Sequence, residues 1–397
     1  AGRVLVDRNY QDRYNDPGAV VVEPNARGRS TIRFTADGSK VFVEGDGATR
    51  QGEYPFLDTL DLKTGETERV WRSAQGEYET VVGILDDAGR KLVTYRESRT
   101  DPANLRLRDL DGGVTQLTQF PDPAPQLADV KRELITYTRE DGVQLSGTLY
   151  LPAGYDKDRD GPLPLVMWAY PAEFTDAAVA GQVVDTENRF VRPTGISHLF
   201  LLTQGYAVLD NPSMPIVGKD GAEPNDTYIE QLSASAKAAV DAVVALGVAD
   251  RDRIAVGGHS YGAFMTANLL AHTDLFKTGI ARSGAYNRTL TPFGFQAEQR
   301  SYWEATETYT EMSPFTYANK VNEPILLIHG GADDNSGTFP VQSERFYAAL
   351  KGNGATVRYV VLPLEAHGYR ARESVGHTQW EMVTWLNRYL KPTTAAQ

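Results

Sequence analysis

The chain has 397 residues, more than one hydrophobic core usually accommodates, so we expect two domains. Its 40 basic and 52 acidic side chains give a formal net charge of -12, which disfavours nucleic acid and anionic membrane surfaces as partners. The absence of cysteine excludes disulfides, thiolate metal sites and a cysteine nucleophile, but it leaves the cellular compartment open. No apolar run is long enough to span a bilayer, so we expect a soluble protein.

The first 125 residues alternate short strand-like runs with turn signals, and they contain two similar units. The turn and strand pattern of residues 36–43 returns at residues 87–94, and the hairpin pattern of residues 60–65 returns at residues 108–113. A period of about 50 residues with several strands in each repeat is typical of the blades of a β-propeller.

A propeller needs about four to eight blades to close, and residues 1–125 have room for only about two. We therefore expect the C-terminal blades of an incomplete propeller, whose remaining portion comes from the same precursor or from a separate chain. The alternative is a small independent β-domain. The proline-rich stretch 120–125 cannot continue a strand ladder and is interpreted as the linker, which gives domains 1–125 and 126–397.

Beyond the linker, residues 134–138 and 143–151 flank an Asp-Gly turn and predict a hairpin. Strand patterns then alternate with helical ones, which indicates an α/β domain with a mainly parallel sheet and helices on both faces. Ile229 to Val243 keep helical spacing, after a cap at Asn225-Asp226 and before Gly247. The expected buried strands are residues 163–168, 206–209, 254–256, 278–281, 325–328 and 357–362.

The sequence Gly-His-Ser-Tyr-Gly at residues 258–262 has the pattern of a nucleophile elbow, with a strand pattern before it and a helical pattern over residues 263–272. A serine hydroxyl attacks a carbonyl only when it is exposed by a sharp turn and placed beside a base. We therefore predict an α/β-hydrolase domain with Ser260 as its nucleophile.

In this fold the acid and then the histidine follow the serine, each at the end of a later strand. Residues 329–335 follow one predicted strand and contain Asp333, and residues 365–368 follow the next and contain His367. We assign Asp333 to orient the imidazole and His367 to act as general base and acid, with Asp334 as the rival acid. The alternatives are a turn-forming aspartate and a polar loop histidine.

An oxyanion hole needs two donors. The backbone N–H of Tyr261 is one candidate, and the hydroxyl of Tyr170, which follows the first central strand, is the other; Tyr170 could instead be an aromatic side chain packed at the domain junction. The remaining histidines are interpreted as structural, because none has a partner at metal-ligand spacing, and we expect no metal and no cofactor. They are His198, His259, His272, His329 and His377.

These features together resemble the prolyl oligopeptidase family of serine peptidases. The elbow, the His-Gly-x-x-Asp-x-Asn loop, the tyrosine after the first central strand and the propeller-like N-terminal region carry the resemblance. Within the family, the chain is most similar over residues 30–390 to the glutamyl endopeptidase branch, known from chloroplasts and bacteria. The supporting segments are residues 168–171, 258–272, 279–295 and 365–369.

The resemblance implies that Tyr170 supplies a side-chain oxyanion donor and that Asn335 binds a substrate backbone carbonyl. Cleavage after glutamate needs a cation in the pocket, because a buried carboxylate without a partner is costly. Arg288 is the first candidate, with Phe293 and Phe295 as apolar walls. Arg282 and Arg300 are alternatives, and Arg288 could equally be a surface arginine paired with an acid.

We therefore expect a serine peptidase that forms an acyl-enzyme and cleaves peptides after acidic residues, mainly glutamate. An esterase or aminopeptidase of the same fold needs the same three residues, and a catalytically silent binding scaffold is a further alternative. The compartment stays open between cytoplasm or periplasm in a bacterium and stroma in a plastid, since a trimmed chain lacks its targeting segment.

Overall fold

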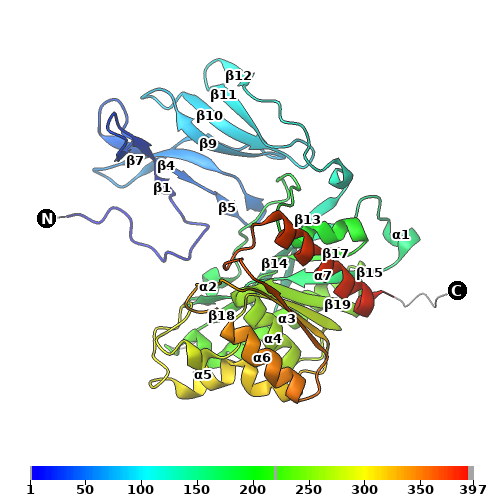
Figure 1. Cartoon of the computed structure of the whole chain (residues 1–397). Helices are drawn as coiled ribbons and strands as arrows, with labels where there is room; N and C mark the ends of the chain where they lie inside the picture. Colours follow the sequence, from blue (N-terminus) through cyan, green and yellow to red (C-terminus); the bar gives the residue numbers. More distant parts are fainter. Residues whose placement is uncertain (1, 219–220, 392–397) are drawn as a thin grey trace. The chain divides into compact units, whose positions relative to one another are not determined.

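The computed structural model describes residues 2–218 and 221–391, which fall into two compact units (Figure 1). The first unit comprises Ala1–Ala128 together with Gln182–Arg192, and the second comprises Asp129–Gly181 and Pro193–Gln397. The division after Ala128 lies three residues beyond the boundary expected from the sequence. Residues 182–192, which the sequence analysis placed in the second domain, belong to the first unit. Among the described residues, no helix combines the length and apolarity needed to cross a membrane.

The described part of the first unit contains two four-stranded antiparallel sheets, each with its strands in chain order. The repeated sequence patterns fall on equivalent strands, because residues 36–43 lead into β4 and residues 87–94 lead into β10. One sheet consists of β1 (Ala19–Val20), β4 (Lys40–Gly45), β7 (Phe56–Asp61) and β8 (Thr67–Arg72). The other consists of β9 (Tyr78–Ile84), β10 (Lys91–Glu97), β11 (Asn104–Asp109) and β12 (Gly113–Gln116).

Smaller elements complete this unit. Residues 182–192 are attached to it by a hydrogen bond from the backbone N–H of Glu53 to the carbonyl of Asp185 and by an ion pair of Arg189 with Glu97 (3.3 Å). The short strands are β2 (Val22–Pro24), β3 (Ser30–Ile32), β5 (Ala48–Thr49) and β6 (Gly52–Glu53), and the 3-10 turn η1 (Pro125–Leu127) ends the proline-rich stretch.

The described part of the second unit is built on one eight-stranded sheet in the order β13-β14-β17-β15-β19-β20-β21-β22. The first three strands pair antiparallel, and every pairing from β17 onward is parallel, so the expected mainly parallel α/β sheet is confirmed. The strands are β13 (Lys131–Thr138), β14 (Gln144–Leu151), β15 (Leu163–Trp168), β17 (Ala207–Asp210), β19 (Ala249–His259), β20 (Thr278–Arg282), β21 (Ile325–Gly330) and β22 (Val357–Leu362).

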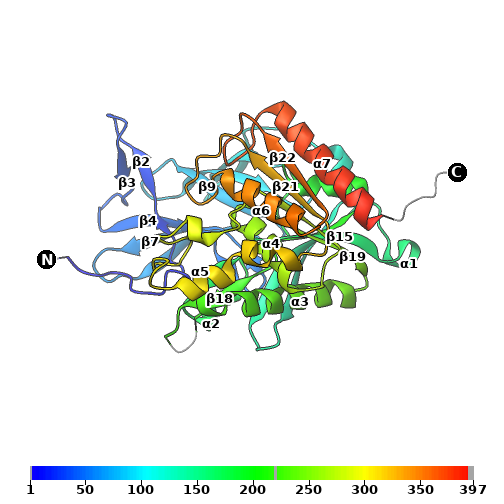
Figure 2. The same ribbon diagram turned by 60° about the horizontal axis from the view of Figure 1, so that its bottom comes forward.

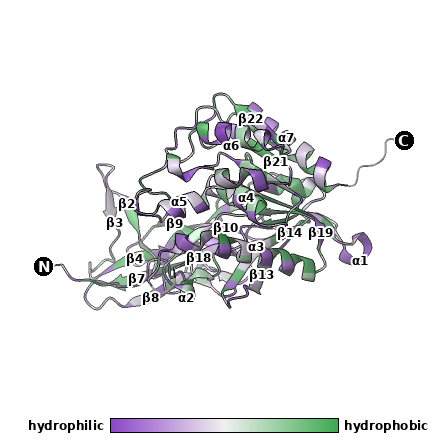
Figure 3. Ribbon diagram, turned by 90° about the horizontal axis from the view of Figure 1, so that it is seen from below, coloured by the Kyte–Doolittle hydropathy of each residue, from purple (hydrophilic) through white to green (hydrophobic). Residues whose placement is uncertain are grey.

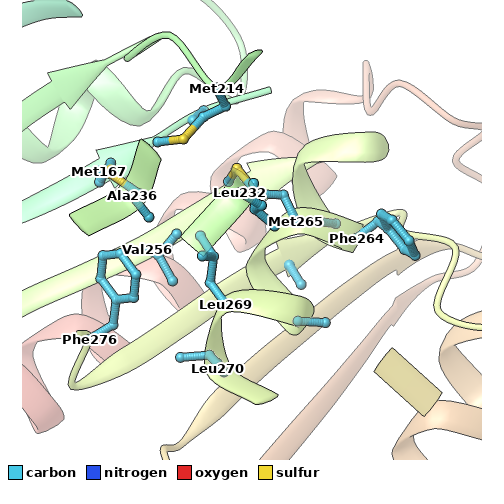
Figure 4. Close-up of a cluster of buried hydrophobic side chains, with 14 of the residues drawn as sticks. Met167, Met214, Leu232, Ala236, Val256, Phe264, Met265, Leu269, Leu270 and Phe276 are labelled. Atoms are coloured by element: carbon cyan, nitrogen blue, oxygen red, sulfur yellow. The ribbon is translucent and has the colours of Figure 1, made fainter. Parts of the chain in front are cut away.

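Helices cover both faces of this sheet (Figures 1 and 2). Successive residues of each strand point to opposite faces, and apolar residues lie on both faces, so each face needs a covering layer. Leu165, Met167 and Val256 face α3 (Tyr228–Ala245), α4 (Tyr261–His272) and α6 (Val341–Gly352), and Figure 4 shows part of this core. Helix α7 (Arg372–Leu390) packs against β19, β20 and β21 together with the 3-10 helix η2 (His198–Gln204). The covering helices carry both hydrophilic and hydrophobic residues (Figure 3).

The remaining elements of the second unit are short. They are α1 (Lys157–Asp160), β16 (Ala172–Phe174), α2 (Ala177–Ala180), β18 (Pro215–Val217), η3 (Pro224–Thr227), η4 (Arg288–Leu290), α5 (Thr306–Met312) and η5 (Pro314–Lys320).

The predicted cap of the helix before the elbow strand is wrong in detail. The N-cap residue of α3 is Thr227, which is also the last residue of the 3-10 helix η3. The amide of Asn225 instead contacts Glu298 (3.5 Å), and Asp226 accepts hydrogen bonds from Arg300 (2.8 Å) and Thr308. The side chains of Asn225 and Asp226, which were expected to cap the helix, therefore form hydrogen bonds with residues far away in the sequence.

The predicted hairpin is present as β13 and β14, and a buried arginine beside its turn ties it to the helical layer. The guanidinium of Arg139 donates hydrogen bonds to the carbonyl of Pro215 (2.9 Å), to Ser235 (3.0 Å) and to Gln231 (3.0 Å). It also pairs with Asp141 at 2.9 Å. Because the charge is buried, these contacts determine whether the hairpin docks on α3 and β18.

Replacing this arginine tests that role. Arg139→Met keeps the apolar stem but removes every donor, so we expect the free energy of unfolding to fall by about 3 kcal/mol. Urea unfolding followed by tryptophan fluorescence measures the loss. The control is Arg159→Met, whose ion pair with Asp160 is exposed to solvent, so this variant should leave the free energy of unfolding almost unchanged. Equal losses in the two variants would contradict the anchoring role.

Candidate active site

The serine elbow forms where β19 ends and α4 begins. Ser260 has a φ of 59° and a ψ of -117°, a strained conformation for a residue that is not glycine. A Cβ added to Gly262 would overlap the carbonyl oxygen of Ala169, and one added to Gly258 would overlap the backbone of Gly262. The two glycines are therefore required for the sharp turn that raises the serine above the sheet.

The candidate acid and base follow adjacent parallel strands, β21 and β22, so their loops lie at the same edge of the sheet. His367 Nδ1 lies 2.9 Å from Asp333 Oδ2. A carboxylate only accepts, so Nδ1 carries the hydrogen and Nε2 is left free to take a proton. Asp333 is buried, whereas the rival acid Asp334 is exposed, and the structure therefore brings Asp333 to the imidazole.

Several donors converge on the Asp333 carboxylate. Besides His367, it accepts hydrogen bonds from His329 Nε2 (3.1 Å), Thr338 Oγ1 (3.1 Å) and the backbone N–H of Asn335 (3.0 Å). Burial alone raises the pKa of Asp333, but the hydrogen bonds from His329, His367 and Asn335 outweigh it and hold that pKa well below its usual value. The carboxylate is thus kept ionised beside the imidazole.

His329 and Thr338 were not recognised from the sequence as site residues. His329 is fully buried, and its Nδ1 lies 2.6 Å from the hydroxyl of Ser343, while Nε2 also lies 2.7 Å from the carbonyl of Thr338. Because both neighbours of Nε2 are acceptors, Nε2 carries the hydrogen and Nδ1 accepts from the serine. The spacing of His329 and Asp333, four residues apart after one strand, was the available signal.

The elbow residue His259, which directly precedes Ser260, packs against the candidate base His367. Its ring lies 4.7 Å from the ring of His367 and 5.9 Å from that of Tyr369, centroid to centroid. Burial, together with the positive charges of Arg282 and His367, lowers the pKa of His259 to about 3. His259 is therefore a neutral packing partner of the candidate base.

Of the two candidate oxyanion donors, Tyr261 directly follows Ser260, and Tyr170 packs against the ring of Tyr261. The backbone N–H of Tyr261 is in the first turn of α4, where no intrahelical acceptor is available. Tyr170 follows β15, is 46% exposed, and its ring packs edge-on against that of Tyr261. The amide of Gln296, a residue with a φ of 50°, donates to the hydroxyl oxygen of Tyr170 at 3.2 Å, which leaves the phenol hydrogen free to donate elsewhere.

A pocket of about 420 Å³ opens at the elbow. It is lined by Ser260 and Tyr261 from the elbow, by the segment that runs from Arg288 to Gln296, and by residues 335–338. All four predicted substrate-binding residues lie in this lining: Arg288, Phe293, Phe295 and Asn335. Residues that lie up to 78 positions from Ser260 in the sequence thus share one cavity with the candidate nucleophile.

Arg288 is the buried cation of this pocket. Its guanidinium lies 4.2 Å from the ring centroids of both Phe264 and Phe295 and 5.3 Å from that of Tyr261. Its Nε has no hydrogen-bond partner, and within residues 2–218 and 221–391 no carboxylate forms an ion pair with it. Burial lowers its pKa. The carboxylate whose charge acts most strongly on Arg288 is that of Glu173, which accepts a hydrogen bond from the hydroxyl of Tyr261 (2.7 Å). A buried guanidinium without a direct ion pair can take an anionic ligand as its partner.

The two alternative arginines are arranged differently. Arg300 already pairs with Asp226 and Glu298 at 2.8 Å each. Arg282 donates to the carbonyl of Ile196 (2.6 Å) and lies over the ring of Trp168, and neither arginine lines the pocket. Of the three cations considered from the sequence, only Arg288 faces the cavity that contains Ser260.

The two predicted apolar walls also differ. Phe295 is 9% exposed and packs on Arg288, as expected of a wall, whereas Phe293 is 81% exposed and lies at the mouth of the pocket. Asn335 is exposed in the lining, and its side-chain oxygen accepts from the backbone N–H of Gly337 (3.3 Å). Over the described ranges, no group of three or more His, Cys, Asp or Glu side chains could hold a metal ion.

Comparison with known proteins gives matches over both the sequence and the fold. Residues 233–393 match the model of the prolyl oligopeptidase family, and residues 141–290 match that of the X-Pro dipeptidyl-peptidase (S15) family. The probable chloroplastic glutamyl endopeptidase of Arabidopsis thaliana is 52% identical over 99% of this chain and 42% of its own length. The corresponding protein of Oryza sativa is 51% identical over 98% of this chain and 43% of its own length. The resemblance expected from the sequence is thereby confirmed, and the chain spans less than half the length of these relatives.

Solved structures match at lower identity. The acylaminoacyl peptidase of Pyrococcus horikoshii superposes with a TM-score of 0.65 at 19% identity, over 93% of this chain and 66% of that one. A puromycin hydrolase superposes with a TM-score of 0.62 at 21% identity, over 91% of this chain and 57% of that one. These structures support the fold.

The buried elbow histidine predicts how stability changes with pH. The folded pKa of His259 is lower than the unfolded value of about 6.5, so the unfolded chain binds more protons between pH 6.5 and 3. Its contribution is therefore complete above pH 6.5 and is lost as the pH falls below that value. We expect the wild type to lose more stability than His259→Asn between pH 7 and pH 5 in urea titrations. Parallel losses in the two proteins would contradict this account.

Proposed function

Because the chain belongs, through residues 233–393, to the prolyl oligopeptidase family, we propose that it is a serine endopeptidase that cleaves after glutamate. The relatives named as probable glutamyl endopeptidases support this choice within the family. One observation carries it: Ser260 and the buried guanidinium of Arg288, whose Nε has no hydrogen-bond partner, line the same cavity.

In this proposal Ser260, Asp333 and His367 form the catalytic triad. His367 Nε2 accepts the hydroxyl proton of Ser260 as Oγ attacks the carbonyl carbon of the scissile bond. Asp333, which accepts from His367 Nδ1 at 2.9 Å, stabilises the imidazolium. The same proton then passes to the departing amine, which leaves an acyl-enzyme, and a water activated by His367 releases the product and restores the serine.

The oxyanion of each tetrahedral intermediate would be held by two donors. One is the backbone N–H of Tyr261, and the other is the phenol hydrogen of Tyr170, whose oxygen is already engaged by Gln296. Asn335, which also lines the pocket, would bind a backbone carbonyl of the peptide. These roles need no cofactor.

The preference for glutamate follows from the surroundings of Arg288. Phe264, Phe295 and Tyr261 surround its guanidinium and exclude water from it. A substrate carboxylate entering this pocket would form a direct, charge-assisted ion pair with the guanidinium. A neutral side chain of equal size would gain packing but would form no such ion pair.

We further propose that the two four-stranded sheets of the first unit are blades of a β-propeller and that the substrates are peptides. Each sheet has four antiparallel strands in chain order, and the repeated sequence patterns fall on equivalent strands. The remaining portion of the propeller would come from the same precursor or from a separate chain.

Replacing Arg288 tests the acidic pocket. Internally quenched peptides that differ only in carrying Glu, Gln or Ala before the scissile bond are compared. We expect Arg288→Gln to lower kcat/KM for the Glu peptide by on the order of 10²-fold, because the substrate carboxylate loses its partner, and to change the Ala peptide little. Arg345→Gln, at an exposed position on α6, is the charge-matched control and should leave all three rates unchanged.

Equal wild-type rates on the Glu, Gln and Ala peptides would contradict the acidic pocket while leaving the peptidase in place. A matched ester and peptide pair separates the remaining alternatives. Hydrolysis of the ester alone would favour an esterase, and failure of a fluorophosphonate to label Ser260 in the folded protein would favour a binding scaffold.

A further inference from the structure

Two large aromatic side chains at the mouth of the pocket remain in solvent. Phe293 is 81% exposed and Trp303 is 67% exposed, and their ring centroids are 5.6 Å apart. We call this pair the aromatic shelf. Exposed aromatic surface of this size is unfavourable in water, and on a folded protein it commonly marks a binding site.

The shelf is held in place by its backbone. The N–H of Tyr302 donates to the carbonyl of Pro292 (2.8 Å), and the N–H of Gly294 donates to the hydroxyl of Tyr309 (2.9 Å). That hydroxyl in turn donates to the carbonyl of Arg300 (2.7 Å). The two segments that carry the shelf are thus joined at both neighbours of Phe293 and at the residue before Trp303. Such preorganisation lowers the entropy cost of binding a ligand.

Side-chain packing adds to this support. The ring of Tyr302 lies edge-on against Trp303, with centroids 5.7 Å apart, and edge-on against Tyr309 at 5.8 Å. Tyr302 itself packs against the hydrophobic core of the second unit. The indole of Trp303 therefore packs on Tyr302, while most of its surface remains exposed to solvent.

The shelf is continuous with the proposed catalytic pocket. Phe293 lines the cavity that contains Ser260 and Arg288, and so does Leu290, which is also exposed. A peptide that places a glutamate on Arg288 therefore occupies a cavity whose lining includes the exposed ring of Phe293. The nearby cation Arg300 is neutralised by Asp226 and Glu298, so the shelf offers its ligand aromatic surface in place of charge.

We propose that the aromatic shelf is a second substrate subsite, which binds an apolar or aromatic side chain of the peptide close to the glutamate. The subsite rests on the proposed function, since its ligand is part of the same substrate. It extends recognition from one residue to two and would restrict cleavage to glutamates with apolar neighbours.

The test uses two internally quenched peptides with one central glutamate. In one peptide the residues on both sides of the glutamate are leucine and phenylalanine, and in the other they are glycine and serine. For the wild-type chain we expect kcat/KM to be about tenfold higher on the apolar-flanked peptide, the gain typical of burying an additional side chain on an aromatic surface.

Trp303→Ala should remove most of that preference, with the rate on the glycine-flanked peptide nearly unchanged. Trp380→Ala is the matched control, because Trp380 is 57% exposed on α7 and does not line the pocket. It should retain the full preference. Phe293→Leu, which shortens the shelf but keeps an apolar wall, should give an intermediate preference.

The outcomes separate the subsite from the proposed function. If the wild type cleaves the glycine-flanked peptide after glutamate but shows no preference between the peptides, or if Trp303→Ala slows both equally, the subsite is wrong and the peptidase stands. If neither peptide is cleaved after glutamate, the proposed function itself fails. A change of oligomeric state in Trp303→Ala, measured by light scattering, would instead assign the shelf to contacts between copies of the chain.

Discussion

The hydrogen bonds that converge on the carboxylate of Asp333 are the interaction on which the candidate site depends. His367, His329, Thr338 and the backbone of Asn335 all donate to it, so it lies between the proposed base and the loop that lines the pocket. Without an ionised carboxylate at this point, the imidazole would have neither a fixed tautomer nor a partner for its positive form. His329 fixes the acid in turn, through hydrogen bonds to Ser343 and Thr338.

The parallel sheet makes this convergence possible. The strands that precede Ser260, Asp333 and His367 are β19, β21 and β22, and parallel strands place the residues that follow them at one edge. The acid and base loops also approach so closely that a Cβ on Gly330 would overlap the carbonyl oxygens of Glu365 and Ala366. Glu365 fixes the base loop by accepting the backbone N–H groups of Arg370 (2.8 Å) and Ala371 (2.9 Å).

Periodic local signals predicted the strands, the hairpin and the elbow, because each is encoded within a few neighbouring residues. Sequence analysis assigned Asp333 as the acid but kept Asp334 as a rival, because what distinguishes the two residues is the burial of Asp333 and its contact with His367. Long-range contacts could not be predicted from local patterns either: the amide of Gln296 donates to the hydroxyl of Tyr170, which is 126 positions away in the sequence. Residues 182–192, whose partners lie in the first unit, were assigned to the second domain for the same reason.

The central claim is that Ser260 is a nucleophile in a pocket that selects a carboxylate. The most direct measurement is the rate at which an aryl phosphonate ester with a glutamate side chain modifies the folded chain, compared with its glutamine analogue. The account predicts a single adduct on Ser260, located by peptide mass mapping, that forms at least tenfold faster with the glutamate reagent. Equal rates for the two reagents, or modification at any residue other than Ser260, would contradict it.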